Sequence, residues 1–157
     1  MENLEQKVNE LTRRVQALED ELAIQRLIVR YGFAVDIGDA EHTAELFTED
    51  TVYDVDVFVM HGRDDIRKMV VTDPHRALVG RCAHQLGPTL VHVDGDRAVA
   101  TGYSRVYLRQ GEGIEVFRVS FNRYELVRRD GRWQIAHRTT RLLGHEEARN
   151  LFAAALS

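Results

Sequence analysis

The second half of the sequence consists of four long segments separated by turn signals, and this pattern constrains the fold more than any other feature. The segments are residues 82–93, 97–109, 114–127 and 133–143. Between them lie glycine-containing turns that begin near Asp94, Gln110 and Arg129. Such turns connect neighbouring antiparallel strands as hairpins. We therefore predict a meander of four long strands, followed by a last helix at residues 145–156.

The first half has the spacing of helices. Apolar residues recur at steps of three and four from Ile24 to Val35, which predicts an amphipathic helix. Gly38 is a helix stop, and Asp39 is a suitable N-cap for a second helix at residues 40–47. The alternating residues 52–58 predict a strand that contains a bulge or a strand end. A further short helix is predicted at residues 64–71. Helices followed by an antiparallel meander indicate an α+β fold, in which a strongly bent sheet with helices across its open side forms a cone around a pocket.

A heptad pattern precedes this domain. Its six apolar residues are Leu4, Val8, Leu11, Val15, Leu18 and Leu22. Valine at a positions and leucine at d positions, flanked by charged residues, are typical of a coiled coil. We assign residues 1–23 to a helical extension and residues 24–157 to the domain. Fewer than three heptads make a weak free-standing coiled coil, so we expect the extension to pair with a neighbouring subunit or to lie against the domain.

Composition narrows the range of partners. At 157 residues the chain fits one domain with a real core. The net charge is −4 and basic residues form only isolated pairs, so nucleic acid is not expected as a partner. No apolar run approaches the length of a membrane span. The single cysteine, Cys82, fits a reducing compartment, and we expect a cytoplasmic protein that does not bind membranes.

An acid and a histidine are the first candidate site residues. Asp36 lies at the C-terminal end of the predicted helix, where the helix dipole and apolar neighbours both disfavour its ionised form, and this makes it a candidate general base. His84 shares a strand face with Cys82 and Leu86. If this face points into the pocket, Asp36 can fix the imidazole tautomer and leave the other ring nitrogen as a general base. A solvated turn for Asp36 and a structural role for His84 are the simpler alternatives.

Other catalytic arrangements have weaker support in the sequence. A Cys82–His84 thiolate pair is conceivable, but buried cysteines are usually inert. The remaining histidines have no metal-ligand spacing, and Asp54 and Asp56 on one strand face fit solvated charge better than a cation site. No glycine-rich phosphate loop is present. We expect neither a metal nor a cofactor.

Alternate residues of the third long segment are candidates for a pocket wall. One face carries Val116, Arg118, Ser120, Asn122 and Tyr124. This face is too polar for a core and too apolar for open water, although plain surface fits it equally well. Arg138 and Arg141 on the last segment are able to hold an anionic or carbonyl group of a substrate, or to pair with surface acids, and the sequence leaves both possibilities open.

Four motifs in this sequence resemble one known family. The matching stretches are Ile24-Gln25-Arg26-Leu27 with Tyr31 and Asp36, then Leu46-Phe47-Thr48-Glu49-Asp50 with Tyr53, then His84-Gln85-Leu86-Gly87, and finally residues 124–133. Together they are similar to the SnoaL-like branch of the nuclear-transport-factor-2-like (NTF2-like) superfamily, over nearly the whole chain. The likeness is greatest to its Asp–His lyases, such as scytalone dehydratase, bile-acid 7α-dehydratase and hexachlorocyclohexane dehydrochlorinase. The resemblance implies a cone-shaped α+β fold.

The resemblance also implies an activity. His84 would abstract a proton, Asp36 would orient and charge it, and Tyr31 or Tyr53 would hydrogen-bond a carbonyl or leaving hydroxyl. With Asn122 and Arg138 as further substrate-binding residues, the implied enzyme is a cofactor-independent lyase for a small cyclic apolar substrate. An isomerase or cyclase with the same base is the alternative enzyme, and a non-catalytic binding or assembly module is the alternative class. A homo-oligomer, dimeric or trimeric, is expected.

Overall fold

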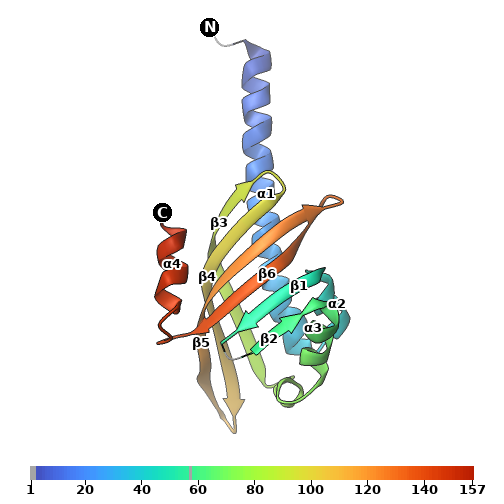
Figure 1. Ribbon diagram of the computed structural model, residues 1–157, viewed down its shortest axis with the longest axis vertical. Coiled ribbons are helices and arrows are strands. Elements are labelled where there is room, and N and C mark those ends of the chain that lie inside the picture. The colour runs from blue at the N-terminus through green and yellow to red at the C-terminus, as the bar shows by residue number, and fades with distance from the viewer. Residues whose placement is uncertain (1–2, 57) are drawn as a thin grey trace.

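The computed structural model describes residues 3–56 and 58–157, which form a curved six-stranded sheet with helices packed on it (Figure 1). The elements in chain order are α1 (Leu4–Ile37), α2 (Ala40–Glu45), β1 (Phe47–Val55), β2 (Phe58–His61), α3 (Gly62–Val71), η1 (His75–Ala77), β3 (Cys82–Asp94), β4 (Arg97–Gln110), β5 (Gly113–Arg129), β6 (Arg132–Leu142) and α4 (Ala148–Ala155). The strand order is β2-β1-β6-β5-β4-β3, and every pair is antiparallel except β1 with β6. The predicted α+β class and the long meander are confirmed.

Three predicted boundaries are wrong. The single strand at residues 52–58 is instead a hairpin of β1 and β2, because Asp56, with a φ of 42°, turns the chain; Val57 lies outside the described residues. The helix predicted at residues 40–47 ends at Glu45, since Phe47 is fully buried as the first residue of β1. The last helix begins at Ala148 instead of residue 145, because the residues before it form a turn.

Helix α1 divides into two parts with different surroundings. Ile24, Ile28 and Val35 on its C-terminal part are almost completely buried and belong to the main core. Residues 3–19 are exposed, and this part of the helix extends beyond the sheet (Figure 1). Asp20 is the first buried residue of the helix. No helix in the described part of the chain is long and apolar enough to cross a membrane.

A glycine allows α1 to approach β3 closely. A Cβ atom on Gly32 would lie 2.7 Å from the carbonyl oxygen of His84 and 2.7 Å from Cδ1 of Leu86. These distances are too short for any side chain, so only glycine fits here without a shift. Asp36 follows one helical turn later on the same face of α1. The glycine contact therefore sets the distance between Asp36 and β3.

Candidate functional site

Asp36 and His84, which lie 48 positions apart in the sequence, are in direct contact. Oδ1 of Asp36 accepts a hydrogen bond from Nδ1 of His84 at 2.6 Å, and Oδ2 accepts one from the backbone N–H of His84 at 2.8 Å. Both side chains remain partly exposed, His84 at 17% and Asp36 at 18%. Because Nδ1 donates to the carboxylate, Nε2 is the ring nitrogen left to accept a proton. Within the part of the chain that the structure describes, Nε2 has no hydrogen-bond partner.

The ionised form of Asp36 is stabilised, which differs from the expectation at its position. Burial raises the pKa of Asp36, as predicted from its apolar neighbours, but hydrogen bonds from the ring and backbone of His84 outweigh burial. The net result is a pKa below the usual value of 3.8. Asp36 is therefore a carboxylate at neutral pH, suited to orienting a histidine instead of acting as a base itself.

Cys82 lies beside this pair. Its Sγ is 3.4 Å from Oδ1 of Asp36 and 4.0 Å from Nδ1 of His84, so the thiol contacts the acid more closely than the histidine. Burial and the charge of Asp36 raise the pKa of the thiol to about 11. A thiol that stays protonated at neutral pH is a poor nucleophile, which disfavours a Cys82–His84 thiolate pair.

The same three residues are the one group in the described ranges that could hold a metal ion. Their ligand atoms lie within 4.8 Å of one another, and a set of one oxygen, one sulfur and one nitrogen is of the kind that Zn²⁺ accepts. The separation of 2.6 Å between Asp36 and His84 is that of a hydrogen bond, and the raised pKa of Cys82 opposes a thiolate ligand. These donors fit a hydrogen-bonded pair better than a metal centre.

A second histidine lies near the pair and was not a candidate from the sequence. The ring of His75, on η1, is centred 6.0 Å from the ring of His84, and its Nε2 lies 2.8 Å from the backbone oxygen of Val35. The sequence holds no signal for this contact, because the position of η1 depends on how the chain between α3 and β3 folds over the end of α1.

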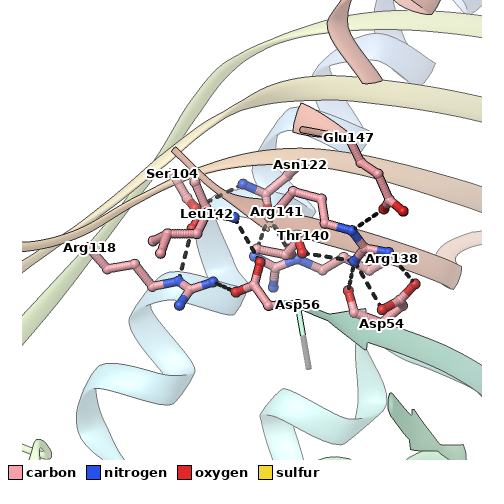
Figure 2. A network of polar contacts seen from close by, with 11 residues as sticks. Asp54, Asp56, Ser104, Arg118, Asn122, Arg138, Thr140, Arg141, Leu142 and Glu147 are labelled. Atoms are coloured by element: carbon pink, nitrogen blue, oxygen red, sulfur yellow. Dashed lines mark hydrogen bonds and ion pairs between the residues drawn. The ribbon is translucent and has the colours of Figure 1, made fainter. Parts of the chain in front are cut away.

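The three predicted substrate-binding residues, Tyr53, Asn122 and Arg138, form a separate, buried cluster, of which Figure 2 shows Asn122 and Arg138. Oδ1 of Asn122 accepts hydrogen bonds from Nε and Nη2 of Arg138 at 3.2 and 2.9 Å, and from Thr140 at 2.7 Å. The guanidinium carbon of Arg138 lies 4.4 Å from the ring centroid of Tyr31 and 4.5 Å from that of Tyr53. Tyr31, Tyr53, Asn122 and Arg138 are all at most 6% exposed.

Arg138 has an unusual electrostatic position. None of the described acidic residues forms an ion pair with it, so its charge is stabilised mainly by tyrosine rings and amide oxygen. Its Nη1 is buried and has no hydrogen-bond partner among the described residues. A buried donor without a partner is costly, because burial removes the water that would otherwise accept its hydrogen bond.

Tyr31 contacts the Arg138 cluster from the same helix that carries Asp36. It belongs to the Arg138 cluster and precedes Asp36 by five residues on α1, an axial rise of about 7.5 Å. Burial and the neighbouring Tyr53 raise the pKa of Tyr31 above its ordinary value of 10.0. Tyr31 is therefore neutral at physiological pH and can donate a hydrogen bond.

One prediction about charged residues on the sheet is corrected by the structure (Figure 2). Asp54 and Asp56 were expected to be solvated charges, but each pairs with an arginine. Arg141 binds Asp54 at 2.7 Å and Glu147 at 2.6 Å, so its donors are used within the chain. Arg118 pairs with Asp56. In the sheet register, His84 on β3 is aligned with Val106 on β4, which is aligned with Arg118 on β5.

Comparison with known proteins places these residues in a family. The sequence profile of the SnoaL-like domain matches residues 16–139, which is most of the chain. This chain belongs to the SnoaL-like family. No curated protein has a sequence that matches it.

Solved structures show the same SnoaL-like architecture. An NTF2-like protein with a cystatin-like fold from Novosphingobium aromaticivorans is 39% identical, has a TM-score of 0.88, and covers 96% of this chain and 97% of its own. A protein of unknown function from Mycobacterium tuberculosis is 27% identical, with a TM-score of 0.75 and coverage of 90% and 89%. A candidate scytalone dehydratase from N. aromaticivorans is 21% identical, has a TM-score of 0.69, covers 80% and 85%, and shows the fold alone. The predicted NTF2-like fold is confirmed.

Proposed function

We propose that this SnoaL-like protein is a cofactor-independent lyase that eliminates water, or a comparable HX group, from a small cyclic carbonyl compound. His84 is the general base, Asp36 orients it, and Tyr31 donates a hydrogen bond. The single observation that carries the proposal is the twofold contact of Asp36 with His84, through Nδ1 and through the backbone N–H. This contact supports a fixed ring orientation with Nε2 free to accept a proton.

The elimination is balanced without another reagent. Nε2 of His84 takes a proton from the carbon next to the carbonyl group, and the electron pair of that C–H bond forms the new C=C bond. The hydroxyl or other leaving group departs from the neighbouring carbon with the electrons of its own bond. The imidazolium of His84, stabilised by Asp36, then returns the proton to the leaving group or to water.

The Arg138 cluster supports a substrate that carries a carbonyl oxygen. Negative charge develops on this oxygen as the proton leaves, and the unused Nη1 of Arg138 together with a neutral Tyr31 would stabilise it. Tyr53 and Asn122 hold the guanidinium in place.

The test uses a series of one-ring and two-ring β-hydroxy ketones, beginning with β-hydroxycyclohexanones. We expect an enone product, detected by its ultraviolet absorbance and by the loss of the mass of water. His84→Ala should lower the turnover about 10²–10⁴-fold, the usual contribution of a general base. His92→Ala is the matched control, because His92 is an exposed histidine on the same strand and should leave the turnover unchanged.

The outcomes separate the alternatives. A product of unchanged mass that has taken up deuterium from D₂O would favour an isomerase with the same base. Absence of both turnover and binding across the cyclic ketones would contradict the enzyme and favour a binding or assembly module. We also propose a cytoplasmic location, consistent with the single cysteine, and a homo-oligomer, whose geometry is developed next.

A further inference from the structure

The outer face of α1 carries a continuous stripe of exposed apolar side chains. The stripe is defined as Leu4, Val8, Leu11, Val15, Leu18, Leu22, Val29, Phe33 and Ile37, each of which is 41–75% exposed. On an ideal helix all nine fall within an arc of about 100°, on the side opposite the buried residues Ile24, Tyr31 and Val35. With α1 about 50 Å long, this is a larger exposed apolar surface than a monomer normally presents.

The pattern of the stripe identifies what covers it. Within residues 4–22, leucine occupies every d position and valine occupies two of the three a positions, the third being Leu22. A β-branched residue at a with leucine at d favours two strands in a parallel coiled coil. A heptad seam is self-complementary in a parallel pair, because each a or d residue meets the same residue of the second helix. We propose that a second copy of this chain covers the outer face of α1, as a parallel two-stranded helix pair.

The charges beside the seam agree with the parallel arrangement. In a parallel pair each g residue faces the e residue five positions later on the other helix. Arg14 then faces Glu19 of the partner subunit, and Glu21 faces Arg26 of the partner subunit. The preceding g residue, Lys7, faces the neutral Thr12. Each of the two charged pairs joins a basic residue to an acidic residue, and each pair occurs twice in the dimer.

The interface continues from the projecting part of α1 onto the domain. Val29 and Phe33 lie on the same side of α1 as the heptad residues, and they are 41% and 66% exposed. Phe33 and Ile37 also line a hollow of about 620 Å³ between α1, α2 and the β5–β6 turn, which does not include Asp36 or His84. The a–d repeat itself ends near Leu22, because the next d positions hold Gln25 and Gly32, so the domain segment extends the apolar stripe without extending the heptad pattern.

Sedimentation equilibrium of the full chain tests the stoichiometry. We expect a mass twice the 18.0 kDa of one chain at micromolar concentration. Leu11→Asp and Phe33→Asp should each raise the dissociation constant about 100-fold or more, because each removes an apolar contact from both copies. Ala17→Asp is the matched control, since it adds the same charge to an exposed position on the opposite side of α1 and should leave the mass unchanged.

Disulfide trapping tests the direction of the helices. In a Cys82→Ser background, Leu11→Cys and Leu18→Cys should each form an intermolecular disulfide, because identical d positions are adjacent only in a parallel pair. A mass of one or three chains would overturn the proposal, and so would a dimer in which at most one of these cysteines is trapped. Loss of ketone turnover has no bearing on it, since none of the stripe residues belongs to the candidate active site.

Discussion

Asp36 is a residue whose charge state depends on a contact that forms only in the folded chain. The carboxylate accepts two hydrogen bonds from His84, and these bring its pKa below 3.8 although burial acts in the opposite direction. A sequence pattern can place an acid at the end of a helix, but it cannot tell whether donors will meet it there. Gly32 makes this contact possible, because only a glycine lets α1 and β3 approach to the observed distance.

The lowered pKa of Asp36 predicts a pH dependence of stability. Unfolding releases the carboxylate to its ordinary pKa near 3.8, so the unfolded chain binds the proton more readily than the folded chain. The contribution of Asp36 to the free energy of unfolding is therefore present above about pH 4–5 and is lost as the pH falls through the folded pKa. Urea titrations at pH values from 7 to 3 should show a smaller decline of the free energy of unfolding in Asp36→Asn than in the native chain. Glu112→Gln, which removes an exposed acid from the β4–β5 turn, should keep the native decline, and equal slopes in all three proteins would contradict the prediction.

Helix α1 is attached to the sheet at a point that its periodicity does not reveal. Asp20 is only 6% exposed, although it follows a run of exposed residues. Its Oδ1 accepts a hydrogen bond from Nε1 of Trp133 at 3.1 Å and from the guanidinium of Arg128. Arg128 also binds Asp96 in the β3–β4 turn. A charged residue thus joins the helix to two hairpin turns of the sheet.

Removal of this attachment should destabilise the domain. Asp20→Ala leaves the buried indole N–H of Trp133 without its acceptor and removes one of the acceptors of Arg128, and we expect a loss of about 1–3 kcal/mol in the free energy of unfolding. Urea denaturation measures this value. Glu19→Ala changes an exposed neighbour and should stay within about 0.5 kcal/mol of the native chain. If the two variants lose the same amount, Asp20 has no special role in holding the helix.

At the scale of the whole molecule, the N-terminal part of α1 and the domain differ in how much of their surface is buried. Residues 3–19 are exposed, whereas the buried core begins with the residues that follow. The predicted division at residue 23 lies within a continuous helix, and the Asp20 contact indicates that the domain needs a few residues more. The exposed part contributes most of the proposed helix pair.

A shortened chain that lacks residues 1–18 should therefore fold but associate weakly. We expect its circular dichroism to retain the signal of the sheet and its thermal midpoint to be independent of concentration. The midpoint of the full chain should rise with concentration, because a dimer is stabilised by mass action. A shortened chain that fails to fold would show that the extension belongs to the domain. A melting midpoint of the shortened chain that depends on concentration as strongly as that of the full chain would place the interface elsewhere.

Local patterns predicted much of this fold, because periodicity and turn residues act over short distances. The steps from Ile24 to Val35 identify the buried face of α1, and the glycine turns separate the four long strands. The same local signals failed at residues 52–58, where pairing of Tyr53 with Met60 and of Tyr53 with Arg138 decides the structure. Strand pairing joins segments far apart in the sequence, and a single chain holds little record of it.

Local patterns in the sequence predicted the class of fold and the amphipathic helix, and the family resemblance led us to expect an acid beside a histidine. The tertiary structure decided that Asp36 and His84 meet at 2.6 Å, that Cys82 and His75 lie beside them, and that Arg138 is buried among tyrosines. The physical reason is that hydrogen bonds, burial and pKa depend on atoms brought together across long stretches of chain. Side-chain type and spacing predict which groups are able to meet, and only the packing of α1 against the curved sheet determines which of them do.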